Sequence, residues 1–478
     1  MSPFLHLCQQ TIGANYVLSE QDEMLTYLTD QRQREVGKAL AVLSPANSEE
    51  VAALVRLCAE HQIAIVPQGG NTGLVLGSIP DQSGNSIVLS LKRLKRIRKI
   101  DAANNTMTVE AGCLLAEVQA AAQGADRLYP LSLASEGSCT IGGNLATNAG
   151  GTAVLRYGNA RELCLGLEVV TAAGEIWDGL RALRKDNTGY DLRDLFIGSE
   201  GTLGIITAAV IKLFPIPKSE VTALIALADV NAALGLLSLV QEHTGASLTG
   251  FELFSDFCLQ LVHKHFAELP KIFSRSHPQY VLIELSSSET QEHTRTQLEN
   301  LLASALQSGL ILDVVIANSL SQAAAIWKFR ELISSAQARE GKNIKHDISI
   351  PVSQIATFIS ATDTLLQTAF PACRMVCFGH LGDGNLHYNV SPPAHQHAND
   401  FLLAQAQVNR IVHDSVHRHH GSISAEHGIG ALKKEEILLY KSPLEIRLMQ
   451  AIKEALDPHQ LMNPGKVIGV RHETTSLD

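Results

Sequence analysis

Residues 378–390, which read FGHLGDGNLHYNV, constrain the fold more than any other stretch of this chain. Two extended, apolar-leaning runs flank an Asp-Gly pair, and such a pair is a strong signal for a β-hairpin because both turn residues must accept positive φ. With Asp383-Gly384 as a two-residue turn, His380 lies directly opposite His387 on one face of the hairpin. Their Cβ atoms would be about 5 Å apart. Asn389 shares this face because side chains alternate along a strand. The sequence therefore predicts a hairpin that brings two imidazoles together.

Two imidazoles at this separation can bind one divalent metal, although a hairpin with two solvated histidines would be the commoner interpretation of these residues alone. The segment 424–430, SAEHGIG, adds a carboxylate and a further histidine just before a glycine-rich turn. Two histidines and one carboxylate are a typical shell for catalytic zinc, and they leave positions open for substrate. We therefore expect His380, His387 and Glu426 to bind a metal, which leaves His427 as a candidate general base.

A second group of histidines competes with this metal site. His413, His417 and His420 are spaced four and three residues apart in an expected helix over about 400–420. The apolar positions of this helix fall on the opposite side at 100° per residue. We interpret the three histidines as one solvated face.

Three glycine-dense loops lie in the first half of the chain. The loop 67–73 (PQGGNTG) follows an expected strand, residues 136–151 contain two glycine pairs, and the loop 198–204 (GSEGTLG) precedes another expected strand. Glycine lets backbone N–H groups approach a phosphate closely. One such loop would be an ordinary turn, but three indicate a long phosphate-containing ligand lying on the backbone. The nicotinamide fingerprint and the P-loop motif are both absent from the sequence.

Composition limits the classes of protein that this chain can be. With 478 residues, 45% of them hydrophobic, the chain can form two or more domains, and the prolines at 215 and 217 predict a boundary. A net charge of -10 and only 5% aromatic residues argue against a nucleic-acid partner. The eight scattered cysteines are typical of core residues in a reducing compartment.

The sequence predicts neither a membrane-spanning helix nor a targeting segment. Its longest apolar stretch, 221–240, is better explained as a strand followed by a helix capped by Asp229. The first thirty residues contain no Lys or Arg, which excludes a secretory signal and an Arg-rich transit peptide. We expect a cytoplasmic protein or one peripheral at the inner face of the membrane.

Six blocks occur in order between about residues 40 and 468: PQGGNTG, GGNLATNAGG, IGSEGTLGI, GHLGDGNLH, SAEHGIG and NPGK. Together they resemble the FAD-linked D-2-hydroxyacid dehydrogenases of the vanillyl-alcohol-oxidase-type flavoprotein superfamily. The resemblance implies an α+β fold with a two-subdomain FAD-binding domain over 1–217. It also implies a substrate domain over 218–420, with an antiparallel sheet covered by helices. A C-terminal helical segment over 421–478 would return to the flavin.

The same resemblance implies the cofactors. The FAD contacts would come from the three glycine loops, their flanks and one C-terminal position: Pro67, Gln68, Gly69, Gly70, Asn71, Thr72, Gly73, Ser78, Pro130, Ser138, Gly142, Gly143, Asn144, Asn148, Gly150, Gly201, Gly204, Ile205, Ile206 and Asn463. The first loop contains no histidine, so we expect non-covalent FAD. The family's zinc ligands match His380, His387 and Glu426, and its general base matches His427.

Substrate contacts follow from residues 327–351, which read as a helix that ends at Gly341 and a strand over 345–350. Arg330 and Ser334 lie four residues apart on one helical face. With Lys345 and Asn389 they match the substrate contacts of the hydroxyglutarate-oxidising members, in which the hydroxyl residue is usually threonine. Two cations favour a dicarboxylate, so we expect oxidation of D-2-hydroxyglutarate to 2-oxoglutarate, with D-malate as a weaker substrate. The alternative is that both cations are surface charges, paired with Glu331 or Asp347.

Reduced flavin must pass its electrons on, so we expect a second acceptor such as an electron-transfer flavoprotein, a quinone or a cytochrome. The serine in place of threonine keeps a D-lactate or glycolate dehydrogenase as an alternative. Two hypotheses come from other classes: a zinc hydrolase with Glu426 or His427 as base, and a non-catalytic flavin subunit of an electron-transfer complex. A homodimer is one option for the assembly.

Overall fold

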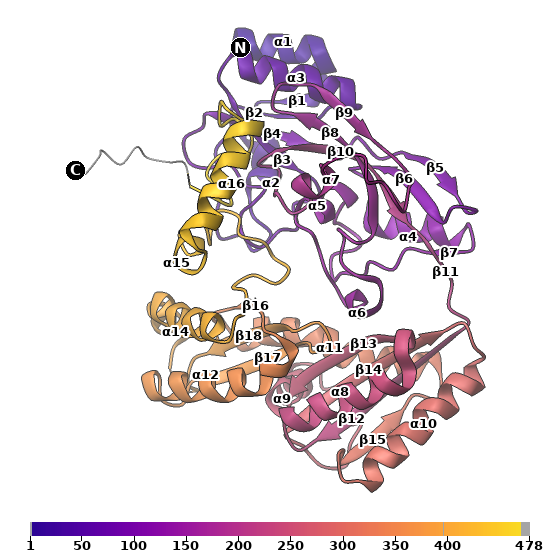
Figure 1. The fold of residues 1–478 in the computed structure, drawn as a ribbon. Helices are drawn as coiled ribbons and strands as arrows, with labels where there is room; N and C mark the ends of the chain where they lie inside the picture. The colour runs from indigo at the N-terminus through magenta and orange to yellow at the C-terminus, as the bar shows by residue number, and fades with distance from the viewer. Residues whose placement is uncertain (1, 395, 470–478) are drawn as a thin grey trace. The chain divides into compact units, whose positions relative to one another are not determined.

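The computed structural model describes residues 2–394 and 396–469. The chain divides into two compact units, whose elements Figure 1 labels. Unit 1 consists of Met1–Gly151, Gly158–Ile216 and Glu426–Asp478, and unit 2 consists of Thr152–Tyr157 and Pro217–Ala425. The chain therefore leaves unit 1 at the predicted proline-rich boundary and returns to it at Glu426.

The first sheet of unit 1 has the strand order β1-β2-β4-β3, with β2, β4 and β3 parallel. Its strands are β1 (Val17–Leu18), β2 (Ala41–Leu43), β4 (Ser86–Ser90) and β3 (Ala64–Gln68), and its helices are α1 (Pro3–Ile12), α2 (Gln21–Leu28) and α3 (Ser48–Glu60). Helix α3 begins after Asn47, whose side chain caps it by accepting a hydrogen bond from the Glu50 N–H at 2.8 Å. Strand β3 ends at Gln68, so the first glycine loop begins at the end of a buried strand.

The second sheet of unit 1 is antiparallel, with the order β5-β6-β10-β8-β9. Its strands are β5 (Ile97–Asp101), β6 (Thr106–Glu110), β10 (Gly204–Lys212), β8 (Cys164–Thr171) and β9 (Ile176–Gly179). The accompanying elements are α4 (Leu115–Gln123), β7 (Arg127–Leu128), α5 (Ile141–Ala146), α7 (Arg193–Phe196) and β11 (Phe214–Pro215), and the returning segment adds α15 (Ile437–Tyr440) and α16 (Pro443–Leu456). The second glycine loop therefore contains α5, and the third ends at the start of β10.

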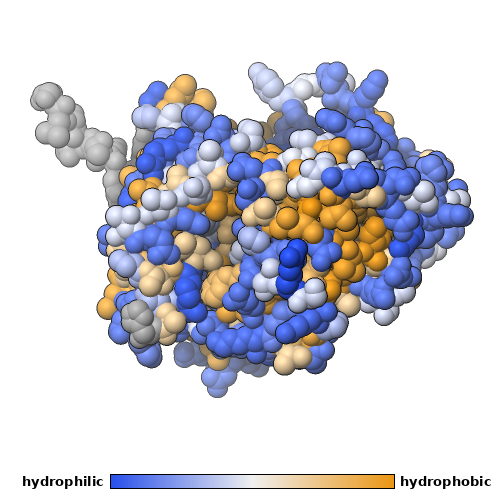
Figure 2. Space-filling view, turned by 90° about the horizontal axis from the view of Figure 1, so that it is seen from below, coloured by the Kyte–Doolittle hydropathy of each residue, from blue (hydrophilic) through white to orange (hydrophobic). Residues whose placement is uncertain are grey.

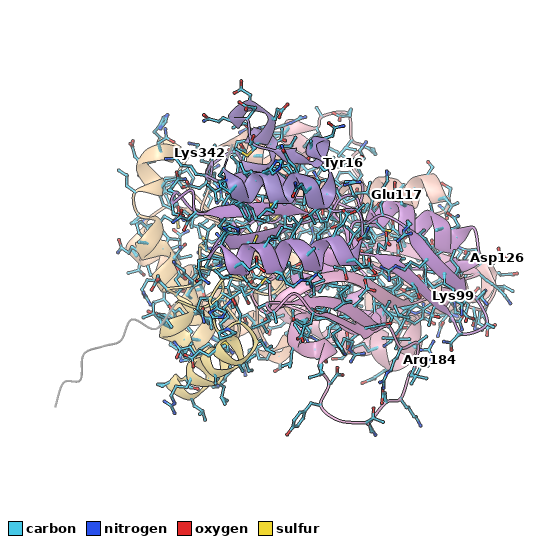
Figure 3. The ribbon with its side chains drawn as sticks, turned by 90° about the horizontal axis from the view of Figure 1, so that it is seen from above. Tyr16, Lys99, Glu117, Asp126, Arg184 and Lys342 are labelled. Atoms are coloured by element: carbon cyan, nitrogen blue, oxygen red, sulfur yellow. The ribbon has the colours of Figure 1, made fainter. Side chains whose placement is uncertain are left out.

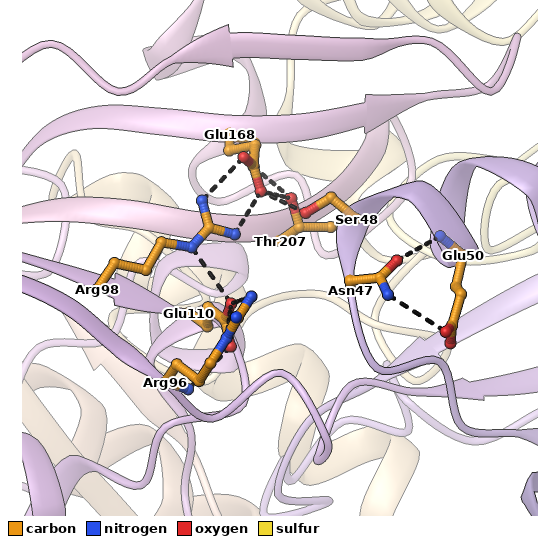
Figure 4. Close-up of polar contacts among 8 residues, drawn as sticks. All are labelled: Asn47, Ser48, Glu50, Arg96, Arg98, Glu110, Glu168 and Thr207. Atoms are coloured by element: carbon orange, nitrogen blue, oxygen red, sulfur yellow. Dashed lines mark hydrogen bonds and ion pairs between the residues drawn. The ribbon is translucent and has the colours of Figure 1, made fainter.

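A buried polar network ties α3 to the second sheet (Figure 4). The Glu168 carboxylate on β8 accepts hydrogen bonds from both Nη atoms of Arg98, at 2.9 and 3.0 Å, and from Thr207 Oγ1 at 2.8 Å. It also accepts one from the Ser48 hydroxyl at the start of α3. Burial opposes ionisation of Glu168, but these donors outweigh it and lower its pKa. The network holds the two sheets of unit 1 together through charge-assisted hydrogen bonds.

Unit 2 is built on a seven-stranded antiparallel sheet with the order β15-β12-β14-β13-β17-β18-β16. Its strands are β12 (Ser219–Leu227), β13 (Leu248–Ser255), β14 (Gln279–Ser287), β15 (Asp313–Ile316), β16 (Asp347–Ser349), β17 (Arg374–His380) and β18 (Asn385–Ser391). Its helices are α6 (Val154–Tyr157), α8 (Val230–Thr244), α9 (Asp256–His265), α10 (Gln291–Gln307), α11 (Leu320–Glu340), α12 (Ile355–Ala369), α13 (Ala398–Leu402) and α14 (Gln405–Arg418). The antiparallel sheet covered by helices is the predicted arrangement.

The predicted hairpin forms, but the predicted register is wrong by two residues. Strands β17 and β18 pair His380 with Asn385 and Phe378 with His387, so residues 381–384 make a longer turn. Only Gly384 of that turn has positive φ, at 85°, and its N–H donates to the His380 carbonyl at 3.1 Å. His380 and His387 are therefore diagonal neighbours rather than a direct pair. They keep a common face, which Asn389 shares as predicted.

The prediction that His413, His417 and His420 form one solvated face of a helix over about 400–420 is wrong for His413; the observed helix α14 ends at Arg418. This side chain is buried, and its ring centroid lies 5.4 Å from that of His346. His417 and His420 are exposed. The buried side of α14 is wider than its apolar residues imply because Ser415 is also buried, where its hydroxyl lies 2.7 Å from that of Thr362.

The surface is largely polar, and the cysteines lie in the interior. Figure 2 shows mainly hydrophilic residues on the face that it presents, with an apolar area gathered in one part. Figure 3 shows Lys99, Glu117, Asp126 and Arg184 at the periphery, where all four are exposed. All eight cysteines are free and buried, as predicted. Among the described helices, none is both long and apolar enough to cross a membrane.

Candidate functional site

The first glycine loop of unit 1 presents a row of backbone donors. No described protein atom accepts a hydrogen bond from the N–H groups of residues 69–73. Asn71 has a φ of 59°, and its side chain is held in place by the Thr29 carbonyl at 2.9 Å and by Ser78 Oγ at 2.9 Å. Consecutive N–H groups around a left-handed residue form a concave anion site. This loop therefore fits the phosphates of a dinucleotide.

The second glycine loop packs closely against the first. A Cβ at Gly69 would collide with Thr140 Oγ1, and a Cβ at Gly70 would collide with the Ser138 carbonyl. At Gly142 an added Cβ would lie 2.6 Å from the Ala111 Cβ. These glycines are required by the close approach of neighbouring backbone and side-chain atoms rather than by turn conformation. The loops predicted to hold FAD are thus brought together within unit 1.

Three buried polar atoms near these loops have no partner among the described residues: Gln68 Oε1, Asn144 Nδ2 and Asn463 Oδ1. Asn463 nevertheless is fixed in place, because its Nδ2 donates to the carbonyls of Gly77 at 2.8 Å and Glu200 at 2.7 Å. Unpaired buried polar atoms are rare in folded proteins and call for a ligand or ordered water. Their position beside the donor loop fits a polar cofactor such as FAD.

The segment that returns to unit 1 is anchored by a buried carboxylate. Glu200 accepts hydrogen bonds from the N–H groups of Ile429 at 2.7 Å and Gly430 at 2.8 Å. Burial raises the pKa of Glu200, and the two N–H donors act against that shift. Gly428 has a φ of 82°, and a Cβ there would lie 2.6 Å from Glu200. The turn after His427 is therefore fixed by a residue far away in sequence.

Glu426 begins this returning segment. Its carboxylate approaches the second glycine loop, where a Cβ added to Gly150 would lie 3.3 Å from Glu426 Oε1. Glu426 and His427 are both partly exposed. The predicted carboxylate ligand and the predicted base therefore border the predicted FAD loops within unit 1.

In unit 2, one face of the sheet carries the predicted site residues His380, His387, Asn389 and Lys345, and we call it the polar face. Cross-strand pairs join Glu252 to His380, Phe378 to His387, and His387 to Asp347. The bridge between Ile344 and Val390 extends this register, which places Lys345 opposite Asn389. The polar face is thus defined by Glu252, Phe378, His380, Asn385, His387, Asn389, Lys345 and Asp347.

The two histidines of the polar face can share a metal ion. Each offers a ring nitrogen, and these atoms lie within 4.8 Å of each other. His380 is buried and its Nδ1 lies 2.5 Å from Glu252 Oε1, whereas His387 Nδ1 lies 3.9 Å from Asp347 Oδ1. Imidazoles with carboxylates behind them are the usual ligands of zinc in proteins. The pair therefore fits half of a tetrahedral zinc shell.

Arg330 lies beside these histidines on α11. Its Nε donates to Glu252 Oε2 at 2.7 Å, and its guanidinium carbon lies 4.8 Å from the Phe378 ring centroid. No described protein atom accepts a hydrogen bond from either Nη of Arg330. Burial opposes ionisation of Glu252, but His380 and Arg330 outweigh it and lower its pKa to about 2. Arg330 therefore offers two donors to an external carboxylate.

The remaining predicted substrate residues occupy different environments. Asn389 is buried, with its Oδ1 accepting from the His346 N–H at 3.2 Å and its Nδ2 donating to Gln337 Oε1 at 2.9 Å. Ser334 and Lys345 are exposed. Arg330 and Ser334 share a face of α11, as their spacing predicts.

Several residues of this region were missed by the sequence analysis. Gln337 follows Arg330 by two helical turns, and its buried Nε2 has no partner among the described residues. Glu284 accepts a hydrogen bond from Trp327 Nε1 at 2.6 Å, and burial raises its pKa to about 7. The one signal for such residues in the sequence is a carboxylate inside an apolar strand, as in GFELF around Glu252.

Comparisons with known proteins agree with this geometry. Residues 39–179 match the family described as "FAD binding domain", and residues 216–467 match "FAD linked oxidases, C-terminal domain". The fold is similar to p-cresol methylhydroxylase with substrate bound, with a TM-score of 0.76 at 16% identity over 98% of this chain and 96% of that chain. It is also similar to 4-ethylphenol oxidase from Gulosibacter chungangensis, with a TM-score of 0.74 at 17% identity over 98% and 97%. These likenesses confirm the predicted vanillyl-alcohol-oxidase-type fold.

Three relatives that match nearly the whole chain share one name. A "D-2-hydroxyglutarate dehydrogenase" from Xanthomonas citri pv. viticola is 39% identical over 98% of both chains. The mitochondrial proteins of the same name from Arabidopsis thaliana and Rattus norvegicus are each 38% identical, over 96% and 95% of this chain and 80% and 83% of theirs. Such identity over nearly the full length exceeds what a shared fold alone would give. The chain therefore belongs to the FAD-linked oxidases, and within them to the D-2-hydroxyglutarate dehydrogenase family.

Proposed function

We propose that this protein oxidises D-2-hydroxyglutarate to 2-oxoglutarate with FAD as the primary electron acceptor. The observation that carries the proposal is the polar face, where a buried arginine with two unused donors lies beside two histidines suited to a metal. A 2-hydroxyacid needs both functions, a cation for its carboxylate and a group that acidifies its hydroxyl. The full-length relatives named D-2-hydroxyglutarate dehydrogenase support the choice of substrate.

FAD would lie on the glycine loops of unit 1, with its phosphates on the N–H groups of residues 69–73. The other predicted FAD contacts are in those loops or at Asn463. When bound, FAD supplies an acceptor for a hydride from C2 of the substrate. The loop offers no histidine for covalent attachment, so we propose that the cofactor is held non-covalently.

His380 and His387 would hold a zinc ion together with Glu426. Glu426 follows Ser422 by four residues, and the Ser422 backbone pairs with Ser349 on β16. The covalent chain therefore limits Glu426 to within ~14 Å of Ser422. When bound, zinc supplies a Lewis acid that favours loss of the proton from the 2-hydroxyl.

Each predicted site residue would have a separate role in the reaction. Arg330 and Lys345 hold the two carboxylates, and Asn389 and Ser334 orient the substrate between them. His427 accepts the hydroxyl proton while C2 loses its hydride, so that the C–O bond becomes a carbonyl and two electrons leave the substrate. Without Arg330, one carboxylate of the substrate would lose its hydration on binding and gain no hydrogen bond in return.

The reduced cofactor must be reoxidised, so we propose an electron-transfer flavoprotein, a quinone or a cytochrome as the second acceptor. We also propose a cytoplasmic enzyme, peripheral at the membrane if its acceptor is a quinone, and a homodimer as its assembly. D-Malate would be a weaker substrate because its distal carboxylate lies one methylene closer to C2.

Anaerobic mixing of the purified, FAD-loaded protein with a panel of hydroxyacids tests the proposal. D-2-Hydroxyglutarate should bleach the flavin absorbance fastest, ahead of D-malate, D-lactate and glycolate, and the L-enantiomer should leave it unchanged. Faster bleaching by D-lactate would show the substrate assignment wrong. No bleaching by any hydroxyacid would favour the non-catalytic flavin subunit instead.

A further inference from the structure

Glu252 contacts the predicted metal ligand and the predicted substrate arginine at the same time. It lies in the middle of β13, which neighbours β17 in the sheet (Figure 1), and is directly opposite His380. Its Oε1 lies 2.5 Å from His380 Nδ1, and its Oε2 lies 2.7 Å from Arg330 Nε. The side chain is only 1% exposed. One buried carboxylate thus uses both oxygens on two functional side chains.

This geometry decides how each partner is oriented. The carboxylate can only accept, so Nδ1 of His380 must carry the hydrogen, which leaves Nε2 as the nitrogen that can bind a metal. On Arg330 the carboxylate occupies Nε, and neither Nη has a protein acceptor among the described residues. A carboxylate behind a metal-binding histidine also raises the basicity of the ring.

We propose that Glu252 is a positioning residue that sets the metal ligand His380 and the substrate-binding Arg330 together. This inference rests on the proposed function and deepens it, because it links metal affinity and carboxylate binding through one side chain. Loss of the Glu252 carboxylate should therefore weaken both. A purely structural ion pair would instead affect folding alone.

Glu252→Gln tests the link because glutamine keeps the volume but has only one acceptor oxygen. The glutamine oxygen can accept a hydrogen bond from His380 or from Arg330, but not from both in the observed geometry. Its NH2 group would then face the N–H of the other residue, which has no acceptor. A matched control is Glu340→Gln, since Glu340 is on the same helix as Arg330 and accepts from Lys264 at 2.6 Å and Arg374 at 3.1 Å. Among the described residues, Glu340 forms no hydrogen bond or ion pair with His380 or Arg330.

The measurement uses the full-length, FAD-loaded protein, first stripped of metal and then titrated with Zn²⁺ against a chelating dye. Glu252→Gln should weaken Zn²⁺ binding by about 10- to 100-fold, the usual effect of losing a group behind a metal-binding histidine. It should also raise KM for D-2-hydroxyglutarate, while Glu340→Gln leaves Zn²⁺ affinity and KM unchanged. Wild-type Zn²⁺ affinity in Glu252→Gln would overturn the inference.

Glu252→Asp keeps the test decisive if the glutamine variant does not fold. Aspartate retains two acceptors but is one methylene shorter, so Zn²⁺ affinity should fall less at full FAD content; wild-type affinity there would again overturn the inference. If the wild-type protein itself takes up no Zn²⁺, the proposed metal centre fails rather than the role of Glu252 toward Arg330. In that case an unchanged KM in the Glu252 variants would overturn the remaining role.

Discussion

Glu200 accepts a hydrogen bond from the backbone N–H of Gly430 at 2.8 Å, across 230 residues of sequence. It accepts a second from Ile429, so this single carboxylate holds the turn that follows His427. Glu200→Ala would leave one buried and one partly buried N–H group without an acceptor. We expect a loss of about 2 to 4 kcal/mol in the free energy of unfolding, from about 1 to 2 kcal/mol for each donor.

Chemical denaturation with and without added FAD measures this loss. Glu454→Ala is the control, because Glu454 is an exposed glutamate on α16 of unit 1. If Glu200 fixes the loop that carries His427, turnover per folded molecule should also fall. Unchanged stability together with unchanged turnover would contradict this role.

His427→Ala should lower kcat by about 10² to 10⁴, the usual size of a general-base contribution. FAD content should stay as in the wild-type protein, because the predicted FAD contacts do not include this side chain. His417→Ala, at an exposed position of α14, is the histidine control and should leave kcat unchanged. A His427 variant with lower stability and normal turnover would show that the side chain only supports the turn.

The glycine loops and the common face of the hairpin histidines could be predicted because both depend on local rules. Glycine clusters after strands and the alternation of side chains need no knowledge of the rest of the chain. The register of the hairpin could not be predicted from the sequence, because contacts with residues far away in the chain determine its turn. A Cβ at Gly382 would meet Leu155 at 2.7 Å, and a Cβ at Gly384 would meet the Ile350 carbonyl. Tertiary packing therefore overrode the Asp-Gly signal.

Glu252 was missed for a related physical reason. A single glutamate in an apolar strand indicates that some partner exists, but not which one. Its partners, Arg330 and His380, lie 78 and 128 residues away. The pairing of β13 with β17 brings His380 to Glu252, and the packing of α11 brings Arg330 to it. Residues whose role is to orient others carry no motif of their own and emerge from the topology.

The FAD should be released by acid. The loop 67–73 offers no histidine, and its donors are backbone N–H groups, so only non-covalent contacts would hold the cofactor. Precipitation with acid should leave the yellow colour in the supernatant, as judged by absorbance. Colour that stays in the washed pellet would indicate a covalent bond.

Glu284 should make stability depend on pH. Burial raises its pKa from 4.5 to about 7, Glu220 and Glu252 add to the shift, and the Trp327 N–H opposes it. In the unfolded chain Glu284 ionises near 4.5, so unfolding releases a proton between that pH and 7. The stabilising contribution is therefore complete below about pH 4.5 and is lost as pH rises through 7.

Glu284→Gln should remove this dependence, because the amide stays neutral at every pH. Thermal unfolding at pH 5, 6 and 8 should show the wild-type protein losing stability with rising pH more steeply than the variant. Parallel slopes in the two proteins would indicate that Glu284 is ionised throughout. The exposed Glu117→Gln variant controls for the general effect of removing one negative charge.

Arg330→Lys should impair binding of the dicarboxylate even though it keeps the positive charge. Arg330 donates to Glu252 through Nε and has both Nη atoms left for a ligand. Lysine offers one compact ammonium group, which cannot bind Glu252 and the substrate carboxylate in the same way at once. A hydrogen bond to a charged group contributes about 1.5 to 3 kcal/mol, so KM for D-2-hydroxyglutarate should rise by about 10- to 100-fold.

Steady-state kinetics of Arg330→Lys with D-2-hydroxyglutarate and D-lactate then identify the carboxylate that Arg330 binds. An increase for both substrates assigns Arg330 to the carboxylate next to C2, which both acids share, and an increase for D-2-hydroxyglutarate alone assigns it to the distal one. An unchanged KM for D-2-hydroxyglutarate would mean that Arg330 serves only to neutralise Glu252.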